Sequence, residues 1–298
     1  MVLPTHNRPE RLEHAAHSIL SQGLVEIELV IVDDASDDHT PEVTGRLADD
    51  PRVTVIRNEQ SLGPSGARNR GIDAAGGSLL GFCDDDDGWM PGAAAVLVGS
   101  LEADPQLGVV TSWHRVVHDA TGRVVEYRGP SRITAEDLLW FNFVALPFGI
   151  VRRSLFPDGL SFDERLPTCE DWDLWLRCAL DHPIGVVSQT LYEYHQHGGE
   201  RVTKEGSADW CGRRGFLDKH AGSMSPACRI YHEAVIAQLA EGRSAMLGTL
   251  AASGVHHPAA AGFAGLLLAG SYEAAVFGMR RGDPGLPART VHRLLGNR

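Results

Sequence analysis

Basic residues are in short supply in this sequence of 298 residues: 27 Lys and Arg face 39 Asp and Glu, giving a formal net charge of −12. A general nucleic-acid-binding protein needs a basic face to neutralise phosphates, so we expect no nucleic-acid partner. Long apolar runs are also missing, because the Ala-, Gly- and Leu-rich stretch 258–279 is interrupted by Glu273. That stretch favours a packed helix over a membrane span.

Cysteines with metal-binding or redox spacing are lacking as well. The five cysteines show no C-x-x-C spacing and leave an odd one over, so we interpret them as free thiols in a reducing compartment. The first residues enter a strand and a loop without the features of a signal peptide. We therefore expect a cytoplasmic protein, with peripheral attachment to the inner face of a membrane through residues 255–280 as an open alternative.

The first hundred residues do contain a repeated alternation of strands and helices. Short connections between them favour a parallel, right-handed, doubly wound α/β sheet. We expect Asn7 to cap the first helix, with Pro9 in its first turn and Glu10 three residues after the cap. The apolar strands are expected at 2–3, 29–32, 53–56 and 78–82, and the helices near 9–22, 41–48 and 64–75.

The second part of the chain is less regular. We expect a hairpin from 108–118 and 124–127, strands at 149–151 and 184–191, and a short helix opened by the capping box Thr134-x-x-Asp137. From about Gly206 strand signals stop, and helices are expected at 207–220, 226–253, 258–279 and 288–295. The predicted division is an α/β domain over 1–204, with halves 1–105 and 106–204, and a helical appendage over 205–298. The appendage could cover the sheet, form a homodimer or contact an acceptor.

Four consecutive acids, Asp84 to Asp87, follow the fourth strand and precede a Gly-Trp-x-Pro turn. An acidic run is often only a solvated loop, and four acids cannot be buried without counter-charge. Acids at the carboxyl end of a sheet strand, however, lie where open α/β sheets bind ligands. Carboxylate oxygens also suit Mg²⁺ or Mn²⁺ bridging phosphates. We therefore favour a metal-assisted nucleotide site.

Phosphates have no glycine-rich cradle in this sequence. Neither G-x-G-x-x-G nor G-x-x-x-x-G-K-[ST] occurs, so the phosphates of a nucleotide would depend on a metal ion with help from Arg68. A second acidic pair, Glu170 and Asp171, opens a later helix. The pair could simply complement the helix dipole, or it could supply a general base.

Taken in order, these motifs resemble those of family 2 glycosyltransferases with the GT-A fold. The resemblance covers roughly residues 1–204. The motifs that carry it are Pro4–Pro9 (PTHNRP), Val32–Ser36 (VDDAS), Gly66–Gly71 (GARNRG), Phe82–Pro91 (FCDDDDGWMP), Glu170–Arg177 (EDWDLWLR) and Tyr194–Gly199 (YHQHGG). The family often has Tyr where this chain has His6, and Arg where it has His195.

The resemblance implies an inverting transfer of a sugar, from UDP or dTDP in the first instance, to an acceptor hydroxyl. Asp171 would be the base, beside Glu170. Asp86 and His197 would bind the divalent metal, Mn²⁺ or Mg²⁺. Asp85 and Asp87 remain interchangeable with their neighbours, because a run of four acids permits a frame shift of one. The residues that the resemblance places around the nucleotide sugar are Pro4, Thr5, His6, Asn7, Asp33, Asp34, Arg68, Asp84 and Asp85.

The chemistry of such a transfer needs a carboxylate to accept the proton of the attacking hydroxyl, and a metal to offset the charge of the departing diphosphate. Two other functions remain open. A sugar-phosphate nucleotidyltransferase would normally carry a basic, glycine-rich segment after the first strand, which Pro4–Glu10 does not provide. A non-catalytic nucleotide-sugar-binding scaffold is the second alternative. The acceptor could be a saccharide, a lipid-linked sugar or a small natural product.

Overall fold

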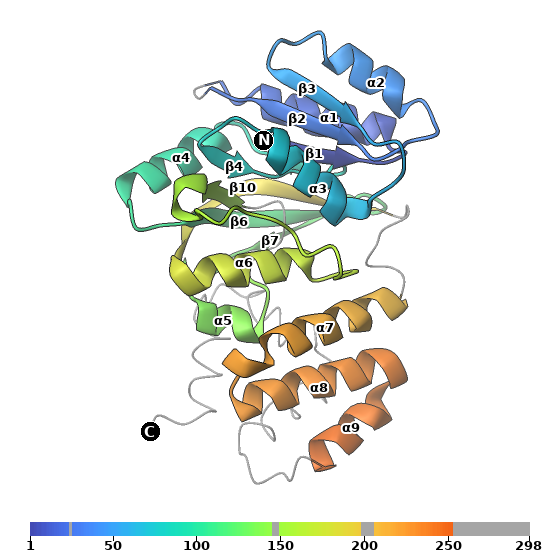
Figure 1. Cartoon of the computed structure of the whole chain (residues 1–298), viewed down its shortest axis with the longest axis vertical. Helices are drawn as coiled ribbons and strands as arrows, with labels where there is room; N and C mark the ends of the chain where they lie inside the picture. The colour runs from blue at the N-terminus through green and yellow to red at the C-terminus, as the bar shows by residue number, and fades with distance from the viewer. Residues whose placement is uncertain (24–25, 145–148, 198–205, 253–298) are drawn as a thin grey trace.

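The computed structural model describes residues 1–23, 26–144, 149–197 and 206–252. At one end of the molecule lies a small parallel sheet, and at the other end the C-terminal helices follow one another; a larger mixed sheet lies between them (Figure 1). The helices predicted at 258–279 and 288–295, and the segment 255–280, lie outside the described residues. Within these residues, no helix combines the length and the apolar character needed to cross a bilayer.

The first sheet is parallel, as predicted, and has the strand order β1-β2-β3. Strand β2 is buried along its whole length, as its continuous apolar sequence indicates. The register pairs Thr5 with Asp33, and Asp33 with Arg57, so three polar side chains end neighbouring strands. The elements are β1 (Val2–Thr5), α1 (Pro9–Leu20), β2 (Leu29–Asp33), α2 (Thr40–Leu47), β3 (Val53–Arg57) and α3 (Gly63–Ala74).

The second sheet is mixed, with the order β4-β9-β6-β10-β5, with β7 beside β6 and β8 beside β10. The predicted hairpin is confirmed as β6 and β7, whose short connection makes them antiparallel. Strand β9 runs antiparallel to both β4 and β6, so the parallel order does not extend through this sheet. The strands are β4 (Leu79–Gly81), β5 (Gly88–Trp89), β6 (Val109–His118), β7 (Arg123–Tyr127), β8 (Arg132–Ile133), β9 (Gly149–Arg152) and β10 (Ile184–Gln196).

The end of β4 still meets the first sheet. Phe82 forms an isolated parallel bridge with Val2, and the Cys83 N–H donates to the Val2 carbonyl at 3.1 Å. The acidic run that follows Cys83 is thereby brought beside Thr5 at the end of β1. The carboxyl ends of β1, β2 and β4 thus form one rim, at which both Asp33–Asp34 and the acidic run lie.

The predicted cap of the first helix is wrong. Helix α1 has Arg8 at its N-cap without a side-chain cap bond, although Pro9 does occupy the first turn. Asn7 has a left-handed backbone (φ 55°), and its side-chain oxygen accepts the Asp37 N–H at 2.9 Å. Asn7 thus ties two loops together instead of capping. The capping box at Thr134 is confirmed at the start of α5 (Ala135–Trp140).

The first two C-terminal helices pack on the helix that carries the second acidic pair, α6 (Glu170–Asp181), and the third packs on the second. Trp172 of α6 stacks on Phe216, with ring centroids 4.3 Å apart. A Cβ at Gly212 would lie 2.0 Å from the Thr168 hydroxyl, so this close approach needs glycine. The remaining helices are α4 (Ala93–Ala103), α7 (Gly206–His220), α8 (Pro226–Glu241) and α9 (Arg243–Ala252); Gly242, with φ 89°, divides the helix predicted over 226–253.

The tryptophans of the motifs belong to the core. Trp175 is fully buried, and Trp172 and Trp89 are only 3% and 5% exposed. The indole N–H of Trp172 donates to the Leu138 carbonyl at 2.5 Å and so fixes α6 against α5. These rings therefore serve the packing of the core.

Candidate active site

The acidic run divides into two sides. Asp84, Asp86 and Asp87 present oxygens that all lie within 4.8 Å of one another. Asp85 bonds elsewhere: its carboxylate accepts the Thr5 hydroxyl and the Arg8 guanidinium, each at 2.8 Å. Three converging carboxylates are a donor set that fits a hard divalent cation, so Asp84, Asp86 and Asp87 are the residues that could hold one. This geometry separates Asp85 from its neighbours, which the sequence alone could not do.

Burial makes the negative charge of this run costly. Asp87 is completely buried, and burial together with Asp86 and Asp84 raises its pKa well above the usual value. Its carboxylate accepts the backbone N–H of His195 at 2.9 Å. Burial likewise raises the pKa of Asp85 to about 6, against the opposing effect of Arg8. A bound cation would relieve this repulsion.

Asp86 is contacted by two basic side chains. Its Oδ2 accepts from Nε2 of His197 at 2.8 Å and from Arg8 at 3.1 Å. The structure thus brings His197 to the acid with which the sequence predicted it would act. The other histidine of this motif, His195, lies in β10, and its ring nitrogens contact Asp119 and Glu193 at 2.9 and 3.0 Å.

Arg68 connects the acidic run to the second acidic pair. One terminal nitrogen of its guanidinium donates to Asp84 at 2.6 Å and the other to Glu170 at 3.1 Å. The side chain is only 6% exposed and lies over the Phe162 ring at 5.5 Å. Burial alone would lower the pKa of Arg68, but Asp84 and Glu170 outweigh it and raise the pKa above its usual value. Arg68 is therefore a fixed cation between two groups of carboxylates.

The second acidic pair stands at the start of α6, next to Cys169, whose backbone is left-handed (φ 66°). Burial and the neighbouring Asp171 raise the pKa of Glu170 to about 7, while Arg68 lowers it in part. Asp171 is half-buried, and its Oδ2 accepts from the Asn142 amide at 2.9 Å. The pair thus combines a carboxyl group held by Arg68 with a carboxylate held by a neutral donor.

The acids at the end of β2 are bonded by their own chain. Asp33 accepts the Ser36 N–H at 2.9 Å and Arg57 at 2.7 Å. Asp34 accepts from donors of the loop before α3, at 2.6 to 3.1 Å; these are the Asn58 amide, the Ser61 hydroxyl and the N–H groups of Leu62 and Gly63. The nucleoside role of this pair stays a prediction.

The residues of the first loop lie beside these acids. Pro4 and Thr5 end β1, and the His6 ring donates from Nδ1 to the Asp34 carbonyl at 2.8 Å. The Asn7 amide donates to the other His6 nitrogen at 3.3 Å. All the sequence-predicted residues of the donor side therefore lie around β1, β2 and the acidic run, as the shared rim requires.

Two residues of the site were not singled out from the sequence. Arg8 belongs to the PTHNRP motif, and the need of four adjacent acids for a counter-charge could have identified it from the sequence. Asn142 belongs to no motif, and it reaches Asp171 only because α5 and α6 pack together. No sequence signal would have identified it.

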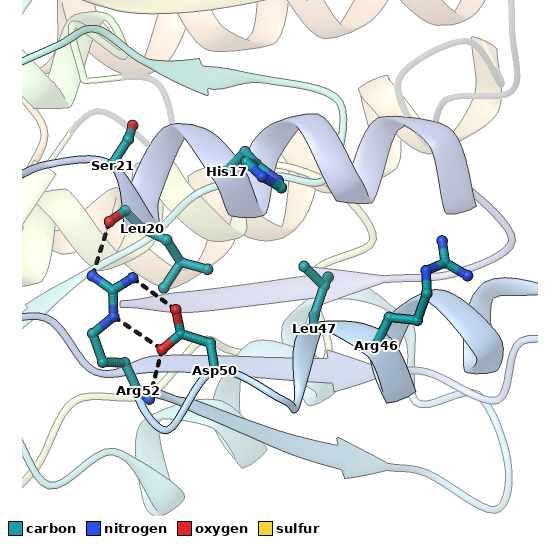
Figure 2. A pocket seen from close by; sticks show the side chains of 7 residues that line it. All are labelled: His17, Leu20, Ser21, Arg46, Leu47, Asp50 and Arg52. Carbon is teal, nitrogen blue, oxygen red and sulfur yellow. Dashed lines mark hydrogen bonds and ion pairs between the residues drawn. The ribbon is translucent and has the colours of Figure 1, made fainter.

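A pocket of about 340 Å³ lies elsewhere, between the ends of α1 and α2 (Figure 2). Arg52 closes one side of it, bonded to the Leu20 carbonyl and to both oxygens of Asp50. None of the acids of the site takes part in its lining, which consists of His17, Leu20, Ser21, Arg46, Leu47, Asp50 and Arg52. The pocket is separate from the converging carboxylates.

Comparisons with known proteins agree with this geometry. The model of the family described as "Glycosyl transferase family 2" matches residues 1–158. A relative from Campylobacter jejuni, GalNAc(5)-diNAcBac-PP-undecaprenol beta-1,3-glucosyltransferase, is 38% identical over 163 residues, which are 52% of this chain and 52% of the relative. The chain thus spans about half the length of that relative.

Solved structures show the same fold. S. aureus TarS 1–349, in complex with UDP-GlcNAc, superposes with a TM-score of 0.60 at 18% identity, over 95% of this chain and 91% of that one. The mannosyltransferase PcManGT from Pyrobaculum calidifontis, with GDP-Man and Mn²⁺, gives 0.58 at 19% identity, over 96% and 83%. From the family match over more than half of its length and from this fold, the chain belongs to glycosyl transferase family 2 and is a glycosyltransferase with the GT-A fold.

Proposed function

We propose that this glycosyltransferase transfers a sugar with inversion from a nucleoside-diphosphate donor to an acceptor hydroxyl, with a divalent metal at the acidic run. One observation carries the proposal: the buried Arg68 guanidinium holds Asp84 on one side and Glu170 on the other. Arg68 thereby fixes the converging carboxylates on one side and Glu170, the neighbour of the candidate base Asp171, on the other. The donor would bind on the Asp84 side of Arg68 and the acceptor on the Glu170 side.

The two halves of the α/β domain have different roles in this transfer. Residues 1–105 bind the donor through the rim of β1, β2 and β4, and residues 106–204 supply the base and the acceptor side. Helices α7 and α8, in the helical region predicted from residue 205, support α6 through Phe216 and His232. Asp84, Asp86 and Asp87, with His197, would hold Mn²⁺ or Mg²⁺, and a bound metal neutralises charge on the diphosphate. The donors bound to TarS and PcManGT, a UDP-sugar and GDP-Man, make a nucleotide sugar the expected ligand.

Asp171 is the proposed general base. Its carboxylate accepts the proton of the acceptor hydroxyl while that oxygen forms a bond to the anomeric carbon. The bond from this carbon to the diphosphate oxygen breaks on the opposite face, and the diphosphate leaves with the electron pair. Glu170, whose pKa is raised to about 7, stays beside Arg68 and orients it.

For the acceptor, we propose a saccharide hydroxyl, with a lipid-linked saccharide as the first candidate. The C. jejuni relative is named for such an acceptor, carried on undecaprenol diphosphate. The donor proposed first is a UDP-sugar, with a dTDP-sugar second. Association with the inner face of a membrane would follow from a lipid-linked acceptor.

A thermal-shift titration with UDP, dTDP and GDP, each with Mn²⁺ or with EDTA, tests the donor site. A ligand at 100 times its Kd stabilises the folded state by about 2.7 kcal/mol, so one diphosphate should raise Tm only when metal is present. Asp86→Ala should abolish this metal dependence, whereas the surface control Asp50→Ala should keep it. Release of pyrophosphate from a nucleoside triphosphate would instead favour a nucleotidyltransferase, and metal-independent binding would remove the metal from the proposal.

A further inference from the structure

The amide of Asn142 contacts the candidate base in a defined orientation. Its Nδ2 donates to Asp171 Oδ2 at 2.9 Å, and its Oδ1 accepts the Val144 N–H at 3.1 Å. A flipped amide would set oxygen against the carboxylate and nitrogen against an N–H, so the hydrogen-bond network fixes which end faces Asp171. The donor is therefore directed at the carboxylate by the backbone of its own loop.

The loop is itself anchored. Val144 is fully buried and Phe141 nearly so, while the Trp172 indole ties α6 to the Leu138 carbonyl of α5. Asn142 and Asp171 are only half-buried, so an acceptor hydroxyl can approach the pair from solvent. The second oxygen of Asp171, Oδ1, accepts the adjacent Trp172 N–H at 2.7 Å. Each carboxylate oxygen of Asp171 thus accepts a hydrogen bond, and the two bonds together fix the orientation of the carboxylate.

A hydrogen bond donated to a carboxylate favours the ionised form and lowers its pKa. The neighbouring Glu170 repels a second negative charge on Asp171, and the Arg68 guanidinium, which attracts Asp171, is bonded to Glu170 and Asp84. The bond from Asn142 adds to the forces that favour the ionised form of Asp171. A neutral amide can supply the bond without adding a cation that would compete for the acceptor proton. The donor suits a base that must be ionised and yet still accept a proton.

We infer that Asn142 is a positioning residue for the general base: it fixes the orientation of Asp171 and keeps it ionised at neutral pH. The inference rests on the proposed function, in which Asp171 is the base. It assigns a role in the transfer to the loop after α5, a segment outside the sequence motifs.

The test compares Asn142→Asp with Asn142→Ala. Asn142→Asp keeps the shape and the contact with Val144 but turns the donor into a second carboxylate; Asn142→Ala removes both contacts. With the best sugar nucleotide from the titration, and hydrolysis or transfer as the readout, kcat at pH 7 should fall at least about tenfold in Asn142→Asp, while nucleotide affinity stays within about twofold. The acidic limb of the pH profile should move to higher pH by about one unit or more.

A second readout needs no substrate. The ¹³Cγ resonance of Asp171, assigned by its loss in Asp171→Asn, should titrate at higher pH in Asn142→Asp than in the wild type, with Asn142→Ala between them. The matched control is Gln22→Glu, which makes the same change of amide to acid at a buried amide bonded to Ser18, Met90 and Ala94. This control should lower Tm without moving the Asp171 titration.

An Asp171 titration that is the same in both Asn142 variants as in the wild type overturns the inference. So does a variant that loses nucleotide affinity and kcat together, because the amide would then be only structural. Failure of the proposed function looks different: Asp171→Asn would retain full turnover, whatever the Asn142 variants do.

Discussion

The end of β2 and the end of β4 both carry runs of acids, yet the fold treats the two runs in opposite ways. Asp33 and Asp34 accept bonds from loop N–H groups, an arginine and polar side chains. Asp84, Asp86 and Asp87 instead converge on one another. A strand end therefore does not by itself make an acid a ligand; the donors that neighbouring strands and loops supply to the acid decide.

The same contrast recurs inside α6. Asp173 is fully buried and accepts from Arg177 at 2.9 Å and from His220 and Lys219 at 2.8 Å. Asp171, two residues earlier, is half-buried and faces the site. We call Asp33, Asp34 and Asp173 the structural acids, and Asp84, Asp86, Asp87, Glu170 and Asp171 the site acids. Neutralising a structural acid should cost stability, and neutralising a site acid should cost activity.

The largest effect is expected at Asp171. Asp171→Asn should lower turnover by about 10²- to 10⁴-fold, the usual contribution of a positioned general base, and leave nucleotide binding and Tm nearly unchanged. Transfer or donor hydrolysis, measured beside a thermal-shift titration, checks both parts. Turnover equal to that of the wild type would remove Asp171 from the site acids as the base.

Asp34→Asn should give the next largest effect, on stability. The new amide nitrogen faces donors of the loop before α3, among them the Ser61 hydroxyl and the Gly63 N–H, so at least one buried donor loses its acceptor at a cost of about 2–3 kcal/mol. Urea unfolding measures the loss. Asp38→Asn is the control, because this exposed acid accepts the Thr40 N–H at the start of α2. A stable Asp34→Asn protein that no longer binds nucleotide would move Asp34 to the site acids.

A smaller effect is expected in how the stability contributed by Asp173 depends on pH. Burial alone would raise the pKa of Asp173, but the bonds from His220, Lys219 and Arg177 outweigh it and lower the pKa to about 2. A depressed pKa stabilises the fold above the unfolded value near 4, and this contribution is lost as the pH falls through 2. The stability difference between wild type and Asp173→Asn should therefore shrink by about 1–2 kcal/mol from pH 5 to pH 2. A difference that stays constant with pH would mean that the charge of Asp173 contributes nothing.

The sequence predicted where the two acidic runs lie, but not which of their carboxylates the rest of the chain would bond. Apolar runs and short connections located β1 to β4, and hence the rim on which both acidic runs lie. The sequence could not predict which acids the loops satisfy, because the donors to Asp34 come from the loop before α3, 24 to 29 residues away. In the same way, Asp85 differs from its neighbours only through Thr5 and Arg8, which reach it across the sheet.

Packing between distant elements explains the other misses. Asn142 meets Asp171 because Trp172 fixes α6 on α5, and no periodicity in the sequence records that contact. The mixed order of the second sheet has a similar origin, since β9 pairs with both β4 and β6 over long separations. Motifs predicted which residues would matter, while tertiary contacts determined what each one does.

The smallest expected effect is the change in stability caused by Asp87→Asn. It is also the most diagnostic, because this substitution should stabilise the metal-free protein, whereas Asp34→Asn should destabilise it. Asp87 is fully buried, and burial with Asp86 and Asp84 raises its pKa well above the usual value, so its ionised form destabilises the metal-free protein at neutral pH. Asp87→Asn keeps an oxygen that can accept the His195 N–H but removes the charge. The metal-free protein should therefore gain about 1 kcal/mol at pH 7 and lose affinity for Mn²⁺.

Urea unfolding in EDTA measures the gain in stability, and electron paramagnetic resonance of Mn²⁺ measures the loss of metal affinity. A raised pKa makes the wild type bind its proton more tightly when folded, so the gain from Asp87→Asn should disappear as the pH falls towards 4. Asp34→Asn, treated identically, should lose stability and keep its Mn²⁺ affinity. If Asp87→Asn instead destabilised the protein as Asp34→Asn does, the two acidic runs would be alike, and the converging carboxylates would be a structural feature of the loop rather than a site kept at the expense of stability.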